Sequence, residues 1–391
     1  YLLREGGSTS VGFLGLLLFV LSGAIALLQG VVFNRIGRRF VFGLISILTV
    51  GVYAAFPYLE PGSPRLAALA LATSIGLFQY FGLANAWALA DSSSHDSSLA
   101  RHYSVIGFGG PIGAVLGAGL AEALSASGRH LQMLVVAAGV VGLSFVVWLM
   151  TESLVPNSTD DRSMFLAQEQ RPAAALTPVG LRIFLGFSYT RALLALIALT
   201  SLSSSLYKWG LARAVELQRS EVGDYAQAFS ENYLVISAVA LGAQALLTPF
   251  SLRVLGAARA LTLLPLAGLA LAGAALLGNS PGWLRWSGTL YLGIDYTVSR
   301  CCREVMYVPT PVEVRFKAKA YLDSLGPQIG VLVGSASVIA LGQWAVVTPP
   351  LIAGALCLVS GGWLTTALFM RRAHDRLLHA HRRPAATRSA G

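Results

Sequence analysis

The chain has 391 residues, of which 55% are hydrophobic and only 12% are charged, and its mean hydropathy is +0.66. A soluble domain carries about 25% charged residues, so this composition excludes a soluble globular protein and predicts a polytopic membrane protein. The apolar runs are continuous rather than alternating, which indicates membrane-spanning helices and argues against a porin-type barrel. The formal net charge of +10 is dispersed over many loops, which argues against binding to nucleic acid.

Hydropathy divides the chain into about eleven segments that are long and apolar enough to cross a bilayer. In chain order they are 11–32, 40–57, 66–89, 105–124, 131–150, 183–206, 233–249, 258–277, 286–300, 321–341 and 350–370. The chain starts at Tyr1, with Arg4 and Glu5 just before the first segment. We expect that a first helix has been lost and that its restoration would give twelve helices.

The predicted fold is all-α, polytopic and similar to major-facilitator proteins, with two six-helix halves. We expect an N-terminal transmembrane half at 1–150, a cytoplasmic linker at 151–180, a C-terminal transmembrane half at 181–370 and a basic tail at 371–391. Most Lys and Arg residues lie in one set of connections, which includes the linker and the tail. The positive-inside rule places this set, and therefore the C-terminus, in the cytoplasm.

Two short loops indicate an internal repeat. The loop Asn34-Arg-Ile-Gly-Arg-Arg39 follows the first predicted span, and it resembles the loop between the second and third helices of major-facilitator-type transporters. A similar order of Arg, Gly and Arg occupies 253–259 in the second half. Two such loops in two halves are expected of an internal repeat. Arginines that flank a glycine turn on the cytoplasmic side are the alternative interpretation.

Glycine recurs every four residues at Gly109, Gly113 and Gly117, inside one apolar run. We reject a dinucleotide-binding loop here, because no strand precedes these glycines. They line one face of a helix, and small residues on a helix face let a neighbouring helix approach closely. The sequence contains no nucleophile, P-loop or zinc-protease motif, so we predict neither an enzyme nor a bound cofactor.

Charged and polar residues near the spans of the second half are the candidate substrate-binding residues. Asp295 lies well inside its predicted span, so it should face the bundle interior or an aqueous cavity. Lys208 lies at a membrane boundary, at the predicted mouth of a cavity, and Asn232 starts the next helix. An interfacial helix with aromatic residues at the membrane surface is the alternative for Lys208.

The stretch 303–323 adds Arg303, Glu304, Lys317, Lys319 and Asp323, of which the last two share a helix face. In the first half, Arg101 enters the glycine-rich helix at the cytoplasmic boundary. Lysines and arginines that face a cavity suit a polyanionic substrate. An ion pair between Arg300 and Glu304 that only neutralises itself is the alternative.

The residues of these segments resemble those of the ATP/ADP translocases of bacteria and plastids, over most of the chain. In the second half the matching residues are Gly180-Leu-Arg182, Lys208-Trp209, Gly223-Asp-Tyr-Ala226, Asn232, Leu264-Pro265, Arg303-Glu304, Tyr307-Val-Pro309, Lys317-Ala-Lys-Ala320 and Asp323. In the first half they are Ala84-Asn-Ala-Trp87 and Arg101-His-Tyr103, followed by Gly107-Phe-Gly-Gly110.

This resemblance implies exchange of nucleotides by alternating access, with Lys208, Arg303, Glu304 and Lys319 at the substrate. The chain departs from the family because its three lysines all lie in the second half, and Lys208-Trp209 reverses the usual order. We therefore expect a secondary transporter for nucleotides or another phosphorylated anion, in the inner membrane of a bacterium. The alternatives are a transporter-fold module without transport, which could serve a soluble cytoplasmic partner, and a generic exporter of metabolites or drugs.

Overall fold

The computed structural model describes most of the predicted spans. The described residues are 12–17, 19–21, 38–92, 99–127, 130–154, 186, 188–218, 222–295, 297, 306, 312–344 and 347–387, and in 99–107, 312–321 and 323–325, among other stretches, the description covers the helix backbone alone. Within these ranges every regular element is a helix. Six of the described helices are long and apolar enough to cross a membrane, and three shorter apolar helices accompany them.

The N-terminal half consists of a short helix and four longer ones. They are the helix at Gly12–Leu21, α3 (Arg38–Leu59), α4 (Pro64–Ser92), α5 (Leu99–Ala126) and α6 (His130–Leu154). Helix α3 packs against both α4 and α6. The rings of Phe42 and Trp148 lie 5.2 Å apart in an edge-to-face contact and join these helices. These two residues form the buried cluster of this half, within the described part of the chain.

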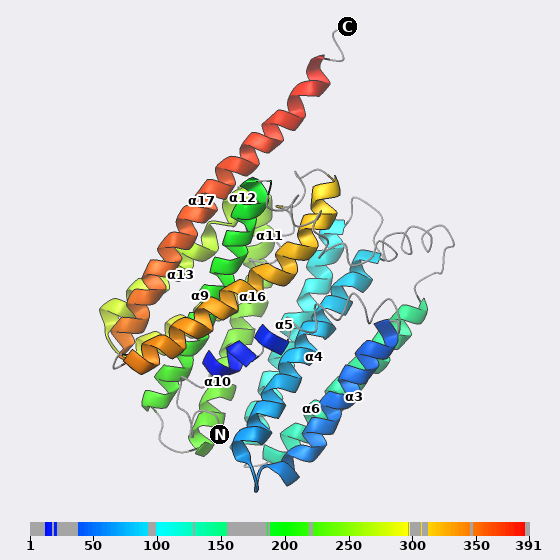
Figure 1. Ribbon diagram of the computed structural model, residues 1–391, viewed down its shortest axis with the longest axis vertical. Helices are drawn as coiled ribbons and strands as arrows, with labels where there is room; N and C mark the ends of the chain where they lie inside the picture. The colour runs from blue at the N-terminus through cyan, green and yellow to red at the C-terminus, as the bar shows by residue number, and fades with distance from the viewer. Residues whose placement is uncertain are drawn as a thin grey trace.

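The C-terminal half is arranged around one central helix, α9. Its elements are α9 (Ser188–Gln218), α10 (Val222–Gly242), η2 (Ala243–Leu247), α11 (Thr248–Phe250), η3 (Ser251–Leu255), α12 (Ala257–Ala260), α13 (Leu263–Gly278), α14 (Pro281–Ile294), α16 (Val312–Trp344) and α17 (Pro349–Thr387). Helix α9 contacts α14, α16 and α17 and supplies many residues of the large buried core. In Figure 1 the two halves lie on opposite sides of the molecule.

Glycines on α16 explain how α9 comes so close to it. An added Cβ at Gly330 would overlap the carbonyl oxygen of Ala198, and one at Gly334 would lie 2.7 Å from the Cβ of Ser205. Gly326 lies one turn earlier on the same face, where an added Cβ would lie 2.7 Å from an Ile197 methyl carbon. Side chains other than glycine would separate the two backbones, so this stripe fixes the α9–α16 contact.

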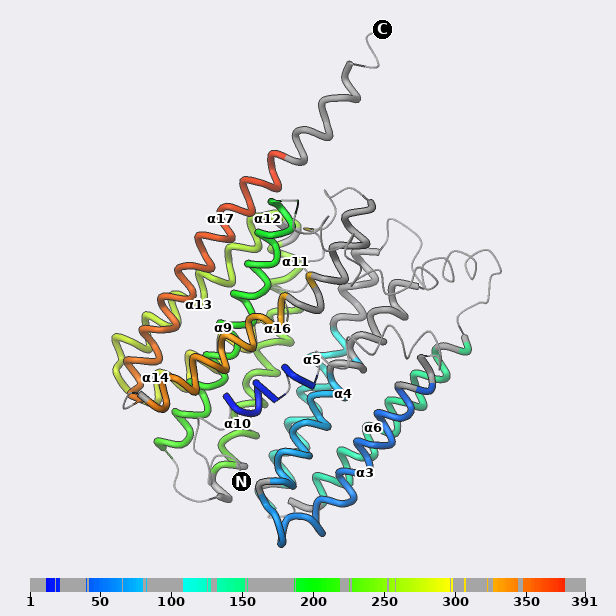
Figure 2. Tube along the Cα trace, viewed as in Figure 1, coloured from blue at the N-terminus to red at the C-terminus, as the bar shows by residue number. Residues whose placement is uncertain are grey.

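Two seams join the halves. Along one seam α5 packs against α10, where an added Cβ at Gly119 would lie 3.9 Å from Leu234. Along the other, the short N-terminal helix lies on α16, and an added Cβ at Gly15 would overlap the Ser335 hydroxyl. Figure 2 shows that α3 and α6 run along one edge of the molecule, with α13 and α17 along the opposite edge. The seams therefore lie between two peripheral helix pairs.

The turn between α13 and α14 is built from residues suited to it. Asn279 has a left-handed φ of 44°, and its N–H caps α13 by bonding to Ala275 O at 3.2 Å. Ser280 then begins α14, with its Oγ accepting the N–H of Trp283 at 3.4 Å. Pro281 takes the first helical position, where a missing N–H removes no helical hydrogen bond.

After Gly242 the helix widens into π-turns. Pro249 has no N–H to continue the α-helical ladder, and the N–H of Thr248 bonds instead to Ala243 O, five residues back. A second π-turn follows, and Gly256, with a left-handed φ of 74°, ends the helix. Single π-turns inside helices are frequent at functional sites.

Helices extend beyond several of the predicted spans, and two cases show the reason. The predicted span ends at Leu206, but α9 runs on to Gln218, because Trp209, Ala214 and Val215 keep one face of the helix buried. The charged stretch before the predicted span 321–341 is also helical, since α16 begins at Val312. Hydropathy alone ends a span where charges appear, whereas a helix continues while its apolar face has a partner.

Candidate functional site

Asp295 is an acidic residue within the predicted span 286–300, and among the described residues it lies beside the central helix α9. Its Oδ2 lies 2.6 Å from the hydroxyl oxygen of Ser204 on α9. The same hydroxyl lies 3.0 Å from Thr200 O, one turn back. A hydroxyl has one proton to donate, and a carboxylate is the stronger acceptor, so the proton goes to Asp295. This hydrogen bond links α9 to the end of α14.

The backbone around Asp295 is distorted as well. Asp295 and Thr297 are in π-helical conformation, and the N–H of Asp295 is directed at both Leu292 O and Tyr291 O. The C-terminal end of a helix carries a partial negative charge, which is unfavourable for a carboxylate. A donor such as Ser204 therefore offsets part of that cost, and the carboxyl remains half-buried at the helix end.

A buried aromatic pair lies one turn from this contact. The rings of Tyr207 and Tyr291 stack with centroids 3.9 Å apart, and the Tyr207 hydroxyl donates to Gly268 O at 2.6 Å. The Tyr291 hydroxyl lies near Ser203, Ser204 and Asp295. Neither it nor Ser203 Oγ makes a hydrogen bond of regular geometry to the described residues. The interior beside Asp295 thus holds polar groups as well as apolar ones.

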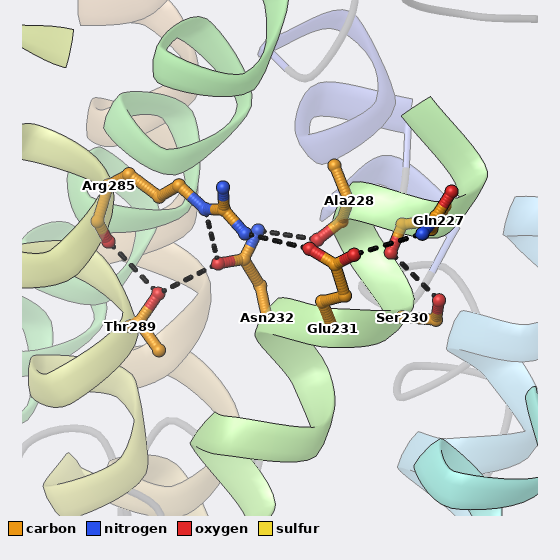
Figure 3. Close-up of polar contacts among 7 residues, drawn as sticks. All are labelled: Gln227, Ala228, Ser230, Glu231, Asn232, Arg285 and Thr289. Carbon is orange, nitrogen blue, oxygen red and sulfur yellow. Dashed lines mark hydrogen bonds and ion pairs between the residues drawn. The ribbon is translucent and has the colours of Figure 1, made fainter. Parts of the chain in front are cut away.

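Asn232 is the centre of a second polar cluster, which Figure 3 shows. Its Oδ1 accepts from Arg285 Nε at 2.8 Å, while its Nδ2 donates to Ala228 O at 2.6 Å. The Thr289 hydroxyl lies 2.9 Å from Arg285 O and 3.3 Å from Asn232 Oδ1. Arg285 also pairs with Glu231 through Nη2 and Oε2, which are 3.3 Å apart. Asn232 is buried, and this cluster holds α14 against α10. These contacts of Asn232 are therefore structural.

A further arginine ties the end of α9 to the turn before α17. Arg213 pairs with Glu216 at 2.8 Å, and its Nε donates to Val347 O at 3.3 Å. Lys208 lies on the exposed side of α9, between the fully buried Tyr207 and Trp209. Within α9, then, Lys208 faces away from the buried core on which its neighbours pack.

The other predicted site residues are placed by backbone only or not at all. Arg101 lies in the first turn of α5, and Lys317, Lys319 and Asp323 lie in α16. Lys319 and Asp323 are four residues apart in one helix, as predicted. Arg303 and Glu304 lie outside the residues that the structure describes. The role of all six in substrate binding stays a prediction.

Sequence reasoning misses Ser204 as the partner of Asp295 and Arg285 as the partner of Asn232. Serines are common in transmembrane helices, and the six residues from Thr200 to Ser205 include five with hydroxyl groups, so nothing singles out one of them. A half-buried Asp295 does require a hydrogen-bond donor, and the hydroxyl residues from Thr200 to Ser205 are candidates for it. The sequence indicates Arg285 only as a loop-end charge, but a buried Asn232 signals that an interior partner exists.

Comparison with known proteins identifies the fold alone. No protein-family model matches the chain, and no curated protein matches it. Among solved structures, a mutant of the peptide transporter POT in complex with alafosfalin is 14% identical with a TM-score of 0.60, covering 95% of this chain and 86% of that one. The human organic anion transporter MFSD10 (TETRAN) is 19% identical with a TM-score of 0.60, covering 94% and 85%.

A third solved structure is the proton:xylose symporter XylE of the major facilitator superfamily. It is 14% identical, with a TM-score of 0.59, and the match covers 93% of this chain and 86% of that one. The chain therefore has a polytopic helical membrane fold of the major-facilitator type. The resemblance to ATP/ADP translocases is a matter of sequence and stays a prediction.

Proposed function

We propose that the protein is a secondary transporter that carries a small polar solute by alternating access between its two halves. The observation that carries this proposal is the hydrogen bond between Ser204 and Asp295. A charge at the centre of a bilayer costs about 2.5–3.5 kcal/mol on insertion scales, so intramembrane carboxylates usually serve ion or substrate pathways. The similarity in fold to proteins named as transporters supports the same proposal.

For the substrate we propose nucleotides or another phosphorylated anion. The support is the sequence resemblance, in which Lys208, Arg303 and Lys319 stand at phosphate-binding positions, and the suitability of such cations for polyanions. One structural neighbour is named as an organic anion transporter. We also propose that the linker and the C-terminus lie in the cytoplasm of a bacterium, on the basis of the positive-inside rule.

A solute that carries a protonated amino group is the second candidate. The observation that favours it is Asp295 itself, because a carboxylate repels phosphate and attracts an ammonium group. A structural neighbour is named as a peptide transporter, and peptides carry such a group. The two candidates differ in the sign of the charge that the C-terminal half binds.

The test is counterflow into proteoliposomes loaded with unlabelled solute. Labelled ATP, ADP, inorganic phosphate and a dipeptide are each offered outside, with the wild type and with Asp295→Asn and Ser204→Ala. We expect Asp295→Asn to abolish counterflow and Ser204→Ala to lower it several-fold. Ser337→Ala is the matched control, because Ser337 is a half-buried serine whose hydroxyl, among the described residues, donates to its own helix, at Val333 O.

Two outcomes would count against the proposal. Counterflow that persists in Asp295→Asn would mean that the pathway does not use this site. Wild-type protein that elutes as a folded species and moves none of the four solutes would favour the transporter-fold module without transport. Uptake of the dipeptide alone would select the second candidate.

A further inference from the structure

Four side-chain oxygen ligands lie together where α14 ends against α9. The Ser204 hydroxyl lies 2.6 Å from Asp295 Oδ2, and the Tyr291 hydroxyl lies near Ser203, Ser204 and Asp295. This oxygen cluster therefore combines one carboxylate with three hydroxyls. Among the described residues no three His, Cys, Asp or Glu side chains gather as metal ligands, in this cluster or elsewhere. The chemistry of the cluster is that of hard oxygen ligands with a single negative charge.

Two of the hydroxyls are buried without a hydrogen bond. The side chains of Ser203 and Tyr291 are both 0% exposed. Neither hydroxyl makes a hydrogen bond of regular geometry to the residues that the structure describes. A buried polar group seldom lacks a partner in a native protein, and a bound ion or water is a common reason when it does. Two such hydroxyls beside one carboxylate point to a ligand that all of them share.

The Ser204 hydroxyl has two acceptors, which lets it change its role. Its oxygen lies 2.6 Å from Asp295 Oδ2 and 3.0 Å from Thr200 O. Because a hydroxyl has one proton, it donates fully to one acceptor at a time. The proton goes to Asp295 when the carboxylate has no cation beside it. When a cation lies between the oxygens, the proton goes to Thr200 O and the lone pairs of Ser204 face the cation.

The end of α14 also attracts a cation. Asp295 and Thr297 are in π-helical conformation, and the carbonyls of Tyr291 and Leu292 share the one N–H of Asp295. The C-terminal end of a helix carries a partial negative charge. In membrane transporters the C-terminal ends of interrupted helices coordinate sodium ions or protons. The helix end is unfavourable for a carboxylate alone and becomes favourable once a cation lies beside it.

The packing around the cluster limits the size of its ligand. An added Cβ at Gly288 would lie 3.3 Å from Tyr207 O, and one at Gly293 would lie 2.6 Å from a Val239 methyl carbon. The ring of Tyr291 also stacks on Tyr207 at 3.9 Å. Helix α14 is thus held close to α9 and α10, which leaves little room for the alkyl chain of an amine. One carboxylate balances one positive charge, whereas calcium sites take several carboxylates. A small monovalent cation satisfies both conditions.

We propose that Ser203, Ser204, Tyr291 and Asp295 form a sodium site at the end of α14. The carboxylate and the three hydroxyl oxygens are its ligands, so the ion gives partners to the two buried hydroxyls and neutralises Asp295. The use of this ion in transport rests on the proposed function. There, a sodium ion removes the repulsion between Asp295 and a phosphorylated anion, so that the ion and the solute are carried together.

A buried water is the competing occupant. It also hydrogen-bonds to hydroxyls and carboxylates, but its occupancy does not depend on which salt is in the buffer. The experiment is therefore thermal unfolding of the purified protein in detergent, in NaCl, KCl or N-methyl-D-glucamine chloride at equal ionic strength and fixed pH. We expect saturating NaCl to raise the Tm by about 4 °C over N-methyl-D-glucamine chloride, with little change in KCl.

Three variants of the cluster test the ligands. Asp295→Asn should abolish the sodium response. Ser203→Ala and Tyr291→Phe each remove one hydroxyl without a partner, and each should raise the half-saturating sodium concentration by about tenfold. Their Tm without sodium should match or exceed that of the wild type, because no hydrogen bond is lost. Ser203→Ala and Tyr291→Phe decide the matter if Asp295→Asn fails to fold.

Ser287→Ala is the matched control for these variants. Ser287 is a buried serine of α14, and its hydroxyl donates to Leu284 O of its own helix at 2.9 Å. Its removal deletes a buried hydroxyl from the same helix but not from the cluster. This variant should therefore keep the full sodium response of the wild type.

Three results would overturn the proposal. The first is the same Tm in all three salts, which would assign the cluster to a water. The second is an equal rise in KCl and NaCl, which would be a general salt effect. The third is a wild-type sodium response in both Ser203→Ala and Tyr291→Phe. None of these measurements needs a solute. A sodium response in a protein that shows no counterflow would leave the site standing without the transporter, and counterflow without a sodium response would do the reverse.

Discussion

The C-terminal half and the N-terminal half differ in how their helices are held. The first has a central helix, α9, that packs against α14, α16 and α17 and supplies much of a continuous buried core. The second has a small aromatic cluster around Phe42 and Trp148, within the described residues. The difference shows that, among the described residues, the helices around α9 bury their side chains against it, whereas the N-terminal half buries few side chains outside one aromatic contact.

The largest effect is expected where α9 meets α16. Gly330→Leu would place a side chain where the carbonyl of Ala198 lies, so the two helices would separate and the core of the C-terminal half would open. We expect a loss of more than about 3 kcal/mol, seen as little folded protein after size-exclusion chromatography in detergent.

Gly354→Leu on α17 is the matched control for that variant. An added Cβ at Gly354 would meet no atom within 4 Å, so the control should elute and melt like the wild type. If Gly330→Leu were equally well tolerated, close contact with α9 would not be what distinguishes the two halves.

A middle-sized effect is expected from the polar cluster on α10 and α14. Arg285→Met removes the donors to Asn232 and Glu231 and leaves two polar groups short of a partner. We expect a loss of about 1–3 kcal/mol, measured as a lower Tm in detergent. Arg191→Met, at an exposed arginine of α9, should leave the Tm unchanged. Equal melting of the two variants would show that the cluster does not stabilise this half.

The smallest effect on stability is expected at two buried tyrosines, one in each half. Tyr207→Phe keeps the ring stack on Tyr291 but leaves Gly268 O without its donor, which should cost about 1 kcal/mol in thermal unfolding. Tyr53→Phe in the N-terminal half should cost less, since its hydroxyl has no partner among the described residues. The comparison would fail if Tyr53→Phe were the more destabilising change.

Membrane class and most helices could be predicted, because runs of about 20 apolar residues seldom occur outside membrane-spanning helices. The extent of α9 could not, since Lys208 and Arg213 look like the end of a span although Trp209 and Val215 remain buried. Hydropathy cannot distinguish a face that meets lipid from one that meets another helix. The same limit applies to the glycine stripes, because spacing predicts a close approach without saying which helix makes it.

The candidate site was predictable in part. Asp295 stands out because a carboxylate inside a membrane span has a high free-energy cost. Asn232 stands out because a buried side-chain amide needs hydrogen-bond partners. Their actual partners, Ser204 and Arg285, lie far away in sequence and depend on which helices are neighbours. The predicted basic residues follow from the resemblance, and their binding role stays a prediction.

The widened helix after Gly242 has a consequence for bending inside a membrane. In hydrocarbon no water can replace a lost amide donor, so a distorted helix must satisfy its carbonyls from within. Here the Thr248 hydroxyl lies 3.3 Å from Ala243 O and the Ser251 hydroxyl lies 2.5 Å from Leu247 O. Both hydroxyls are buried, while Leu246 and Phe250 point outward. The two hydroxyls take the place that water would have in a soluble protein. The stretch can therefore depart from α-helical geometry at the seam between the halves without exposing an unbonded carbonyl to lipid.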